Sequence, residues 1–220
     1  MSLMEVLTPF QREVLNEFFA TEAAGDFFLT GGTALAEFYF QHRLSDDLDL
    51  FTVSDTALPL AREQMQIVAA TLSVTIESRI SAPSFQRFRL TRPGIAPLQV
   101  DLVRDVDAQI GHHQRHGTVV VDALENIGAN KICAVFGRTE GKDFVDLYFL
   151  LEAGLKLPEL IGYAKQKDGG LTEFWLAEML RQVVKLKHLP VMLKPVSLET
   201  IQAYFLRLAD DLLDAIKPPQ

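Results

Sequence analysis

The sequence has one cysteine, Cys133, and one tryptophan in 220 residues. A single cysteine excludes an internal disulfide and a zinc site built from several cysteines, and it is typical of a reducing compartment. Long apolar runs are missing too: the longest span about five residues, whereas a transmembrane helix needs about 20. The first residues lack a basic segment followed by an apolar one, so no signal peptide is expected. We therefore expect a cytoplasmic protein with no membrane partner.

Positive charge is scarce. The chain has 21 Lys and Arg against 29 Asp and Glu, a formal charge of −8. This excludes nucleic-acid binding over the whole surface, because phosphate contacts need clustered Lys and Arg. The charge is unevenly distributed along the chain: the formal net charge is −9 over residues 1–155 and +3 over residues 156–194. A local basic surface in the second part stays compatible with the composition.

The order of secondary-structure signals predicts an α+β fold. Thr8 is a good N-cap, followed by Pro9 and by Gln11 at the capping-box position, and Gly25 is expected to end that helix. From Asp122 onward the pattern is helical almost to the end. We expect one domain over residues 1–153 and a helical region over 154–220. In the first part, strands are expected over 27–30, 47–51, 74–80, 85–91 and 98–103. Two more helices are expected there, over 33–41 and 59–72. In the second of these helices, Ile67, Val68 and Leu72 should point inward.

Two aspartates dominate the most informative segment. In a strand over residues 47–51, Asp47 and Asp49 point to the same face. Two close carboxylates repel each other unless a cation lies between them, and Mg²⁺ prefers such ligands together with substrate phosphates. Gly31 and Gly32 lie at a strand-to-helix turn, where bare N–H groups can receive a phosphate. Asp101, in another apolar strand, could bring a third carboxylate.

An Asp-x-Asp pair by itself is more often a solvated strand face than a metal site. The upstream glycine pair and the later Asp101 reverse this balance, because functional sites gather costly charges. Three carboxylates beside a glycine turn make a workable two-metal centre for in-line attack on a nucleoside triphosphate.

The same residues carry a resemblance to a known family. Segments 31–35 (GGTAL) and 43–51 (RLSDDLDLF) resemble motif I of the nucleotidyltransferase AbiEii/AbiGii toxin family. Segments 130–138 and 142–148 are similar to its motifs III and IV, and Asp101 stands at the motif II carboxylate. The resemblance implies a nucleotidyltransferase fold, a mixed sheet flanked by helices, followed by a C-terminal helical part.

The resemblance also implies roles for individual residues. Asp47, Asp49 and Asp101 would hold Mg²⁺, Lys131 would contact the triphosphate, and Asp146 would be the motif IV acid. Gly31, Gly32, Thr33, Arg43 and Ser45 complete the expected nucleotide-binding set. Arg43 could instead pair with Asp46 at the surface, and without the motif Lys131 would be read as a surface lysine. Asp143 shares a helical face with Asp146, but it also fits a helix-dipole role and ranks below it.

The family consists of toxins of bacterial toxin–antitoxin pairs that use a nucleoside triphosphate, and some members add nucleotides to the 3′ end of tRNA. The resemblance thus implies a triphosphate substrate, a tRNA acceptor and a cognate antitoxin. It also makes Ser45 a candidate for phosphorylation, which would place negative charge beside Asp47.

Three further features have less specific readings. The run 112–116 (HHQRH) is tempting as a metal site, but neighbouring histidines rarely converge on one ion, so we expect an exposed loop. Such a loop could equally line an entrance for nucleic acid. Cys133 is expected in the core. In a predicted helix over 171–188, Arg181, Lys185 and His188 share a face opposite Trp175, which is either an ordinary solvated face or a contact stripe for RNA.

The sequence therefore predicts a magnesium-dependent, toxin-like nucleotidyltransferase with tRNA as acceptor. Two alternatives stay open: an enzyme that modifies a small molecule such as an antibiotic, and a nucleotide-binding regulator without turnover. Acceptor preference separates the two enzymes, and turnover of a labelled triphosphate separates both from the regulator.

Overall fold

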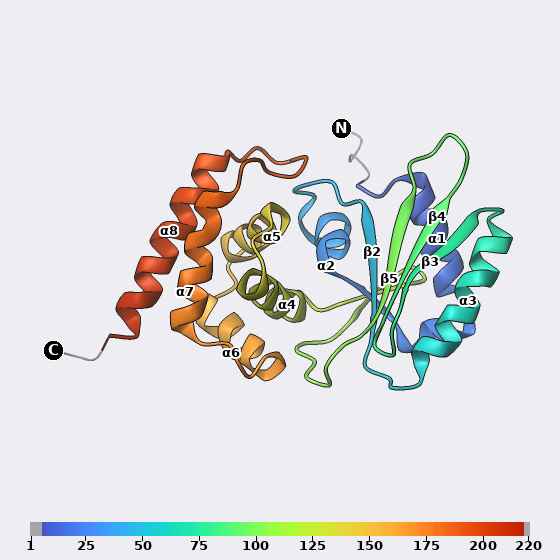
Figure 1. The fold of residues 1–220 in the computed structure, drawn as a ribbon, viewed down its shortest axis with the longest axis horizontal. Helices are drawn as coiled ribbons and strands as arrows, with labels where there is room; N and C mark the ends of the chain where they lie inside the picture. Colours follow the sequence, from blue (N-terminus) through green and yellow to red (C-terminus); the bar gives the residue numbers. More distant parts are fainter. Residues whose placement is uncertain (1–5, 218–220) are drawn as a thin grey trace. The chain divides into compact units, whose positions relative to one another are not determined.

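The computed structural model describes residues 6–217 and divides into two compact units, Met1–Ala123 and Leu124–Gln220 (Figure 1). This division lies before the boundary expected after Ala153 from the charge distribution. The reason is packing: helices of segment 124–152 contribute Val135 and Phe144 to the same apolar core as Leu160 and Phe205 from later helices.

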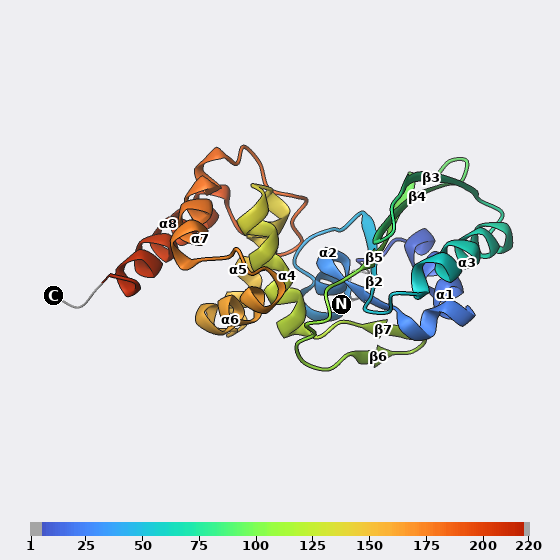
Figure 2. The ribbon, with the colours of Figure 1, turned by 60° about the horizontal axis from the view of Figure 1, so that its bottom comes forward.

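The first unit is built on a seven-stranded mixed sheet with the strand order β3-β4-β5-β2-β1-β7-β6 (Figures 1 and 2). β2 is antiparallel to β1 and parallel to β5. The expected strands of the first part are confirmed within one or two residues, and all lie in this sheet. The strands are β1 Phe28–Thr30, β2 Asp47–Thr52, β3 Thr75–Ser81, β4 Phe85–Thr91, β5 Leu98–Arg104, β6 Gln114–His116 and β7 Val119–Val121.

Helices α1 (Pro9–Phe19) and α3 (Ala57–Thr71) pack against each other on one side of the sheet (Figure 2). On the other side of β2, α2 (Gly31–Ala34) continues as a π-helical segment, Leu35–Phe40 (Figure 1). The alternation of β2 buries Leu48 and Leu50 and leaves the residues between them partly exposed. The sheet thus has one apolar face and one face that carries polar side chains.

The start of α1 follows the sequence signal closely. Thr8 Oγ1 accepts a hydrogen bond from the Gln11 N–H at 3.2 Å, and Gln11 Oε1 accepts one from the Thr8 N–H at 2.9 Å, which is a capping box. The expected end at Gly25 is wrong, because the helix ends at Phe19 with Ala20 as C-cap. The Thr21 hydroxyl donates to Phe18 O at 2.7 Å and satisfies a carbonyl of the last turn.

The orientation expected for α3 is partly wrong. Val68 is buried, but Ile67 is 54% exposed. The buried face runs through Leu58, Ala61, Met65 and Val68 at helical spacing, so Ile67 lies on the opposite side.

The second unit is helical and has its own apolar core. Its helices are α4 Leu124–Gly137, α5 Gly141–Glu152, α6 Leu157–Lys167, α7 Glu173–Arg181 and α8 Leu198–Ala215, with a 3₁₀ turn at Gln182–Lys185. Ring contacts cross this core, such as the edge-to-face pair of Phe144 and Phe205 at 5.0 Å. Cys133 packs beside the core as a half-buried residue, which is close to the expectation.

The helix expected over 171–188 ends earlier. α7 stops at Arg181, and His188 lies beyond the following 3₁₀ turn, so Arg181, Lys185 and His188 do not form a stripe on one helix. Trp175 is 58% exposed, because the buried face is formed instead by Leu176, Leu180 and their neighbours. No helix between residues 6 and 217 is long and apolar enough to cross a membrane.

Candidate active site

Strand register places polar residues in a row across the sheet. Asp49 of β2 pairs with Thr30 of β1 on one side and with Asp101 of β5 on the other, and Asp101 pairs with Arg87 of β4. Paired residues point to the same face of a sheet. Asp47, two residues before Asp49, shares this face, and both carboxylates are partly exposed. The structure therefore brings Asp47, Asp49 and Asp101 onto one polar face.

The glycine turn fits closely against this row. Gly31 begins α2 with φ +70°, a conformation that side-chain-bearing residues rarely adopt. A Cβ atom at Gly31 would overlap the Asp49 carboxylate at Oδ2. Glycine is required at this position because of the positive φ and because a side chain would collide with the Asp49 carboxylate. Backbone and carboxylate consequently lie side by side at the start of α2.

The loop before β2 is fixed by the first turn of α2. The Thr33 hydroxyl lies 2.8 Å from Ser45 Oγ and donates to the main-chain carbonyl of Asp47. Gln11 Nε2 donates to Ser45 O at 2.8 Å, which ties the same loop to α1. These contacts hold Ser45, in the loop, and Asp47, the first residue of β2, in place. Thr33 is thus a positioning residue of the loop.

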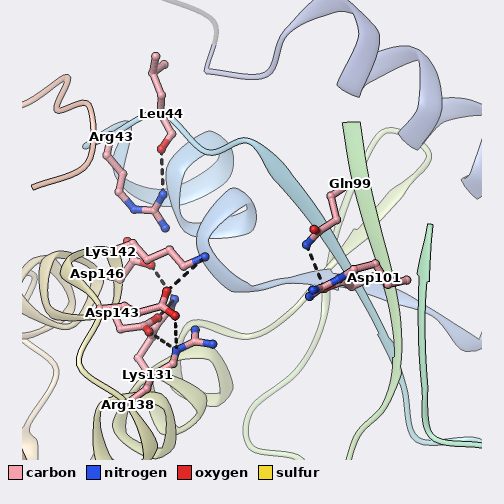
Figure 3. Close-up of polar contacts among 11 residues, drawn as sticks. Arg43, Leu44, Gln99, Asp101, Lys131, Arg138, Lys142, Asp143 and Asp146 are labelled. Atoms are coloured by element: carbon pink, nitrogen blue, oxygen red, sulfur yellow. Dashed lines mark hydrogen bonds and ion pairs between the residues drawn. The ribbon is translucent and has the colours of Figure 1, made fainter. Parts of the chain in front are cut away.

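Arg43 belongs to the same loop and is buried, with 3% exposed. Its guanidinium donates to Leu44 O at 2.8 Å (Figure 3).

Asp101 is held by Arg87, which no sequence motif indicated. Arg87 Nε and Nη2 donate to the two carboxylate oxygens of Asp101 at 2.8 and 2.7 Å. Gln99 Nε2 lies 3.4 Å from the second of these oxygens (Figure 3). The pKa of Arg87 is raised by this hydrogen bonding and by the charges of Asp101, Asp47 and Asp49. A fixed cation therefore lies within electrostatic reach of the aspartates. The only signal for Arg87 in the sequence was its position on the polar side of β4, a strand in which apolar and polar residues alternate.

The carboxylates of the polar face offer part of the donor set that a magnesium ion needs. Asp47 and Asp49 present two partly exposed carboxylates, which suits an ion that takes its other ligands from substrate phosphates and water. Within residues 6–217, no group of three or more acidic, His or Cys side chains is arranged to hold a metal. Asp101 does not complete such a group, because Arg87 occupies both of its oxygens.

A further buried acid extends the row past β1. Thr30 Oγ1 donates to Asp122 Oδ2 at 2.6 Å, and His113 Nε2 lies 3.8 Å from the other oxygen. Asp122 is fully buried. From the sequence, Asp122 was expected only as the start of the helical part, although an aspartate directly after the apolar strand β7 was a usable signal for a site residue.

The histidine run is exposed, as expected, and part of it forms the edge strand β6. The ring of His113 packs on Phe28 at 4.1 Å between centroids. Burial and the nearby His112 lower the pKa of His113, so it is neutral at neutral pH.

Lys131 and Asp146 belong to the second unit, where they form a buried ion-pair cluster with Asp143. Lys131 Nζ lies 2.9 Å from Asp143 Oδ1 and 2.7 Å from Asp146 Oδ2, and Arg138 Nε donates to Asp143 Oδ2 at 2.7 Å (Figure 3). Lys131 is 7% exposed and both aspartates are fully buried. Lys131 is therefore no solvated surface lysine, and it links α4 to α5.

Asp143, which the sequence motifs placed below Asp146, contacts two cations of this cluster, Lys131 and Arg138. Burial raises the pKa of Asp143, but the charge of Lys131 and the hydrogen bond from Arg138 outweigh it and hold the pKa below its ordinary value. Asp143 is thus ionised and shared between two cations.

A basic cavity of about 440 Å³ lies in the second unit. Its charged lining includes Lys142, Lys185, Lys187 and His188, with Glu140 as the acidic member. Two residues of the expected stripe, Lys185 and His188, thus line a cavity rather than a helix face.

A family model described as nucleotidyl transferase AbiEii toxin, type IV toxin–antitoxin system, matches residues 13–218. The chain belongs to the AbiEii nucleotidyltransferase toxin family. The resemblance read from the motif segments is confirmed, and the protein is a nucleotidyltransferase.

Solved structures similar to this AbiEii chain confirm the fold class. A nucleotidyltransferase from H. pylori is 19% identical with a TM-score of 0.61, and 94% of this chain and 95% of that chain are covered. JHP933 from Helicobacter pylori is 18% identical (TM-score 0.60; 93% and 89% covered). MenT4, a nucleotidyltransferase toxin from Mycobacterium tuberculosis, is 15% identical (TM-score 0.65; 93% and 83% covered). No curated protein sequence is significantly similar to the chain.

Proposed function

We propose that this AbiEii protein transfers a nucleoside monophosphate from a triphosphate to the 3′-terminal hydroxyl of tRNA, in a reaction that needs Mg²⁺. The observation that carries the proposal is the contact between the glycine turn and the carboxylates: Gly31 lies against Asp49, and Asp47 shares its face. Such a turn can receive phosphate oxygens on its N–H groups next to the carboxylates.

Asp47 and Asp49 are the residues proposed to hold the metal ion. When bound, Mg²⁺ neutralises the charge of the phosphates and polarises the phosphorus–oxygen bonds. The backbone of Gly31 and Gly32 would bind phosphate, while Thr33 and Ser45 keep the loop before β2 in position. Arg43 stays a proposed contact for the triphosphate.

Three of the proposed roles change in the light of the contacts. Asp101 is proposed to orient Arg87, and it could join a metal only if Arg87 released it. Lys131 contacts two buried aspartates, so a role at the triphosphate would come in addition to joining α4 and α5. Asp146 is proposed to act by holding Lys131.

The reaction itself is a displacement at the α-phosphorus. The acceptor hydroxyl loses its proton to solvent and its oxygen bonds to the α-phosphorus. The bond from the α-phosphorus to the oxygen bridging to the β-phosphorus breaks, and pyrophosphate leaves. The acceptor is inferred from the motif resemblance, because some members of this family add nucleotides to the 3′ end of tRNA. Membership of a type IV toxin–antitoxin family also supports a cognate antitoxin as partner.

The test is incubation of the protein with each α-labelled triphosphate in turn, Mg²⁺ and total cellular RNA. We expect label in the tRNA band with one or two triphosphates and loss of labelling with EDTA. Label in a small molecule and not in RNA would favour the small-molecule alternative. An absence of labelled product with all four triphosphates would contradict the proposal.

A further inference from the structure

The first unit contains a cavity of about 350 Å³ beside Asp47, which we call the arginine cavity. Its polar lining consists of Asp46, Asp47, Arg79, Arg87, Arg89 and Gln99.

The register of the strands explains why arginines gather there. In β4, Arg87 and Arg89 pair with Asp101 and Gln99 of β5, so all four side chains share the polar face. Arg79 comes from β3, at the point where the register with β4 shifts between Ser78 and Ile80. Such a bulge re-aims a side chain. Three arginines from two strands thus line one hollow.

The arginines differ in how far they are already neutralised. The charge of Arg87 is already neutralised by its two hydrogen bonds to the Asp101 carboxylate. Arg79 pairs at 2.9 Å with Glu77, but both side chains are about half exposed, so the pair is weak and open to exchange. The Arg89 side chain is exposed and forms no ion pair or side-chain hydrogen bond with other residues of segment 6–217. The cavity therefore has carboxylates at one end and available guanidinium groups at the other.

The strand order fixes where this cavity lies relative to the glycine turn. The order β1-β2-β5-β4 puts Gly31 on the β1 side of the carboxylates and Arg87 and Arg89 on the β4 side. Displacement at phosphorus proceeds in line, with the entering and leaving oxygens on opposite sides. If pyrophosphate leaves at the glycine turn, the acceptor hydroxyl enters from the β4 side.

The geometry points to the arginine cavity as the subsite for the phosphodiester backbone next to the 3′ end of an acceptor RNA, an inference that rests on the proposed function. Guanidinium groups bind phosphate oxygens through two parallel hydrogen bonds, which holds a strand end in a fixed direction. Arg79 and Arg89 bind the phosphates, and Arg87 neutralises Asp101 in the wall between them and Asp47. A small acceptor without phosphates has no use for this cavity.

The experiment compares two charge reversals. Arg89→Glu changes the cavity, whereas Arg115→Glu is the matched control, because Arg115 is an exposed arginine on β6 at the opposite edge of the sheet. Binding of a short fluorescein-labelled single-stranded RNA with a free 3′ hydroxyl is measured over a salt series. Binding of a non-hydrolysable triphosphate analogue with Mg²⁺ and thermal unfolding are measured on the same samples.

We expect Arg89→Glu to weaken RNA binding about tenfold, the loss typical of one charge-assisted hydrogen bond. We also expect it to reduce the salt dependence by about 0.7 in the log–log slope, the value for one phosphate contact on a single strand. Arg79→Gln should reduce this slope similarly. Triphosphate binding and the unfolding temperature should stay as in wild type, and Arg115→Glu should change none of these readouts.

Equal RNA binding by Arg89→Glu and Arg115→Glu would overturn the inference. A loss of triphosphate binding in Arg89→Glu that Arg115→Glu does not show would overturn it too. Wild-type protein that binds no RNA but labels another acceptor would overturn it as well, while nucleotidyl transfer would stand. Because the binding assay needs no turnover, RNA binding that depends on Arg89 without any labelled product would contradict only the proposed function.

Discussion

Gly31 and Asp49 depend on each other for space, since a Cβ at Gly31 would overlap the carboxylate. Gly31→Ala is therefore expected to abolish nucleotidyl transfer and to cost more than the roughly 1–2 kcal/mol of left-handed strain alone. Gly94→Ala is the matched control: it has φ +77° but nothing within 4 Å of the added methyl group. It should cost only the roughly 1–2 kcal/mol of left-handed strain and keep full activity. Urea unfolding and the labelling assay check both, and an active Gly31→Ala enzyme would disprove the close fit.

Asp47 and Asp49 repel each other on one face of β2. Either substitution to Ala should abolish transfer while the fold persists, and it should not lower stability in the absence of metal, because a like-charge contact is removed. Mg²⁺ should raise the unfolding temperature of the wild type more than that of either variant. A variant that unfolds, or one that transfers nucleotide at the wild-type rate, would rule out the proposed role.

At this scale the sequence indicated the pair Asp47 and Asp49 and the glycine beside them, because alternation in a strand fixes which residues share a face. It did not indicate Arg87 or Asp122. Their partners, Asp101 and Thr30, lie on other strands, and which strands are neighbours is decided by the folded sheet.

At the scale of elements, α4 and α5 are joined by the buried cluster of Lys131, Asp143 and Asp146. Lys131→Ala leaves two buried carboxylates without their shared cation, so we expect a loss of about 3–5 kcal/mol in the free energy of unfolding. Lys165→Ala breaks an exposed pair with Glu173 and should cost less than about 1 kcal/mol. Urea titrations of both variants give the comparison. Similar costs would contradict a structural role for Lys131.

The same cluster predicts a dependence on acid. The folded-state pKa of Asp143 is lowered, so its contribution to stability is complete above the unfolded pKa of about 3.9 and is lost as pH falls through the lower folded value. The free energy of unfolding should therefore fall below about pH 4, and the fall should be shallower in Asp143→Asn. Urea unfolding over a pH series checks this. Parallel curves for the two proteins would contradict it.

At the scale of the whole molecule, the chain divides into two compact units. The second unit has its own core from Ile132 to Leu212, drawn from all five of its helices. We expect residues 124–220 expressed alone to fold into a helical protein that unfolds cooperatively, without transfer activity because Asp47 and Asp49 are absent. Circular dichroism with thermal unfolding checks this. A fragment without a cooperative transition would show that the core depends on the first unit.

The sequence by itself determined the local choices: the capping box before α1, the strands of the first part, the aspartates that share a face of β2, and the family. Each depends on periodicity or on residues close together in the chain. The tertiary structure alone decided that Arg87 holds Asp101, that Lys131 lies between Asp143 and Asp146, that α7 ends at Arg181, and that the compact units divide at Ala123. These outcomes depend on strand order and on which apolar faces cover one another, and periodicity along the chain carries no information about either.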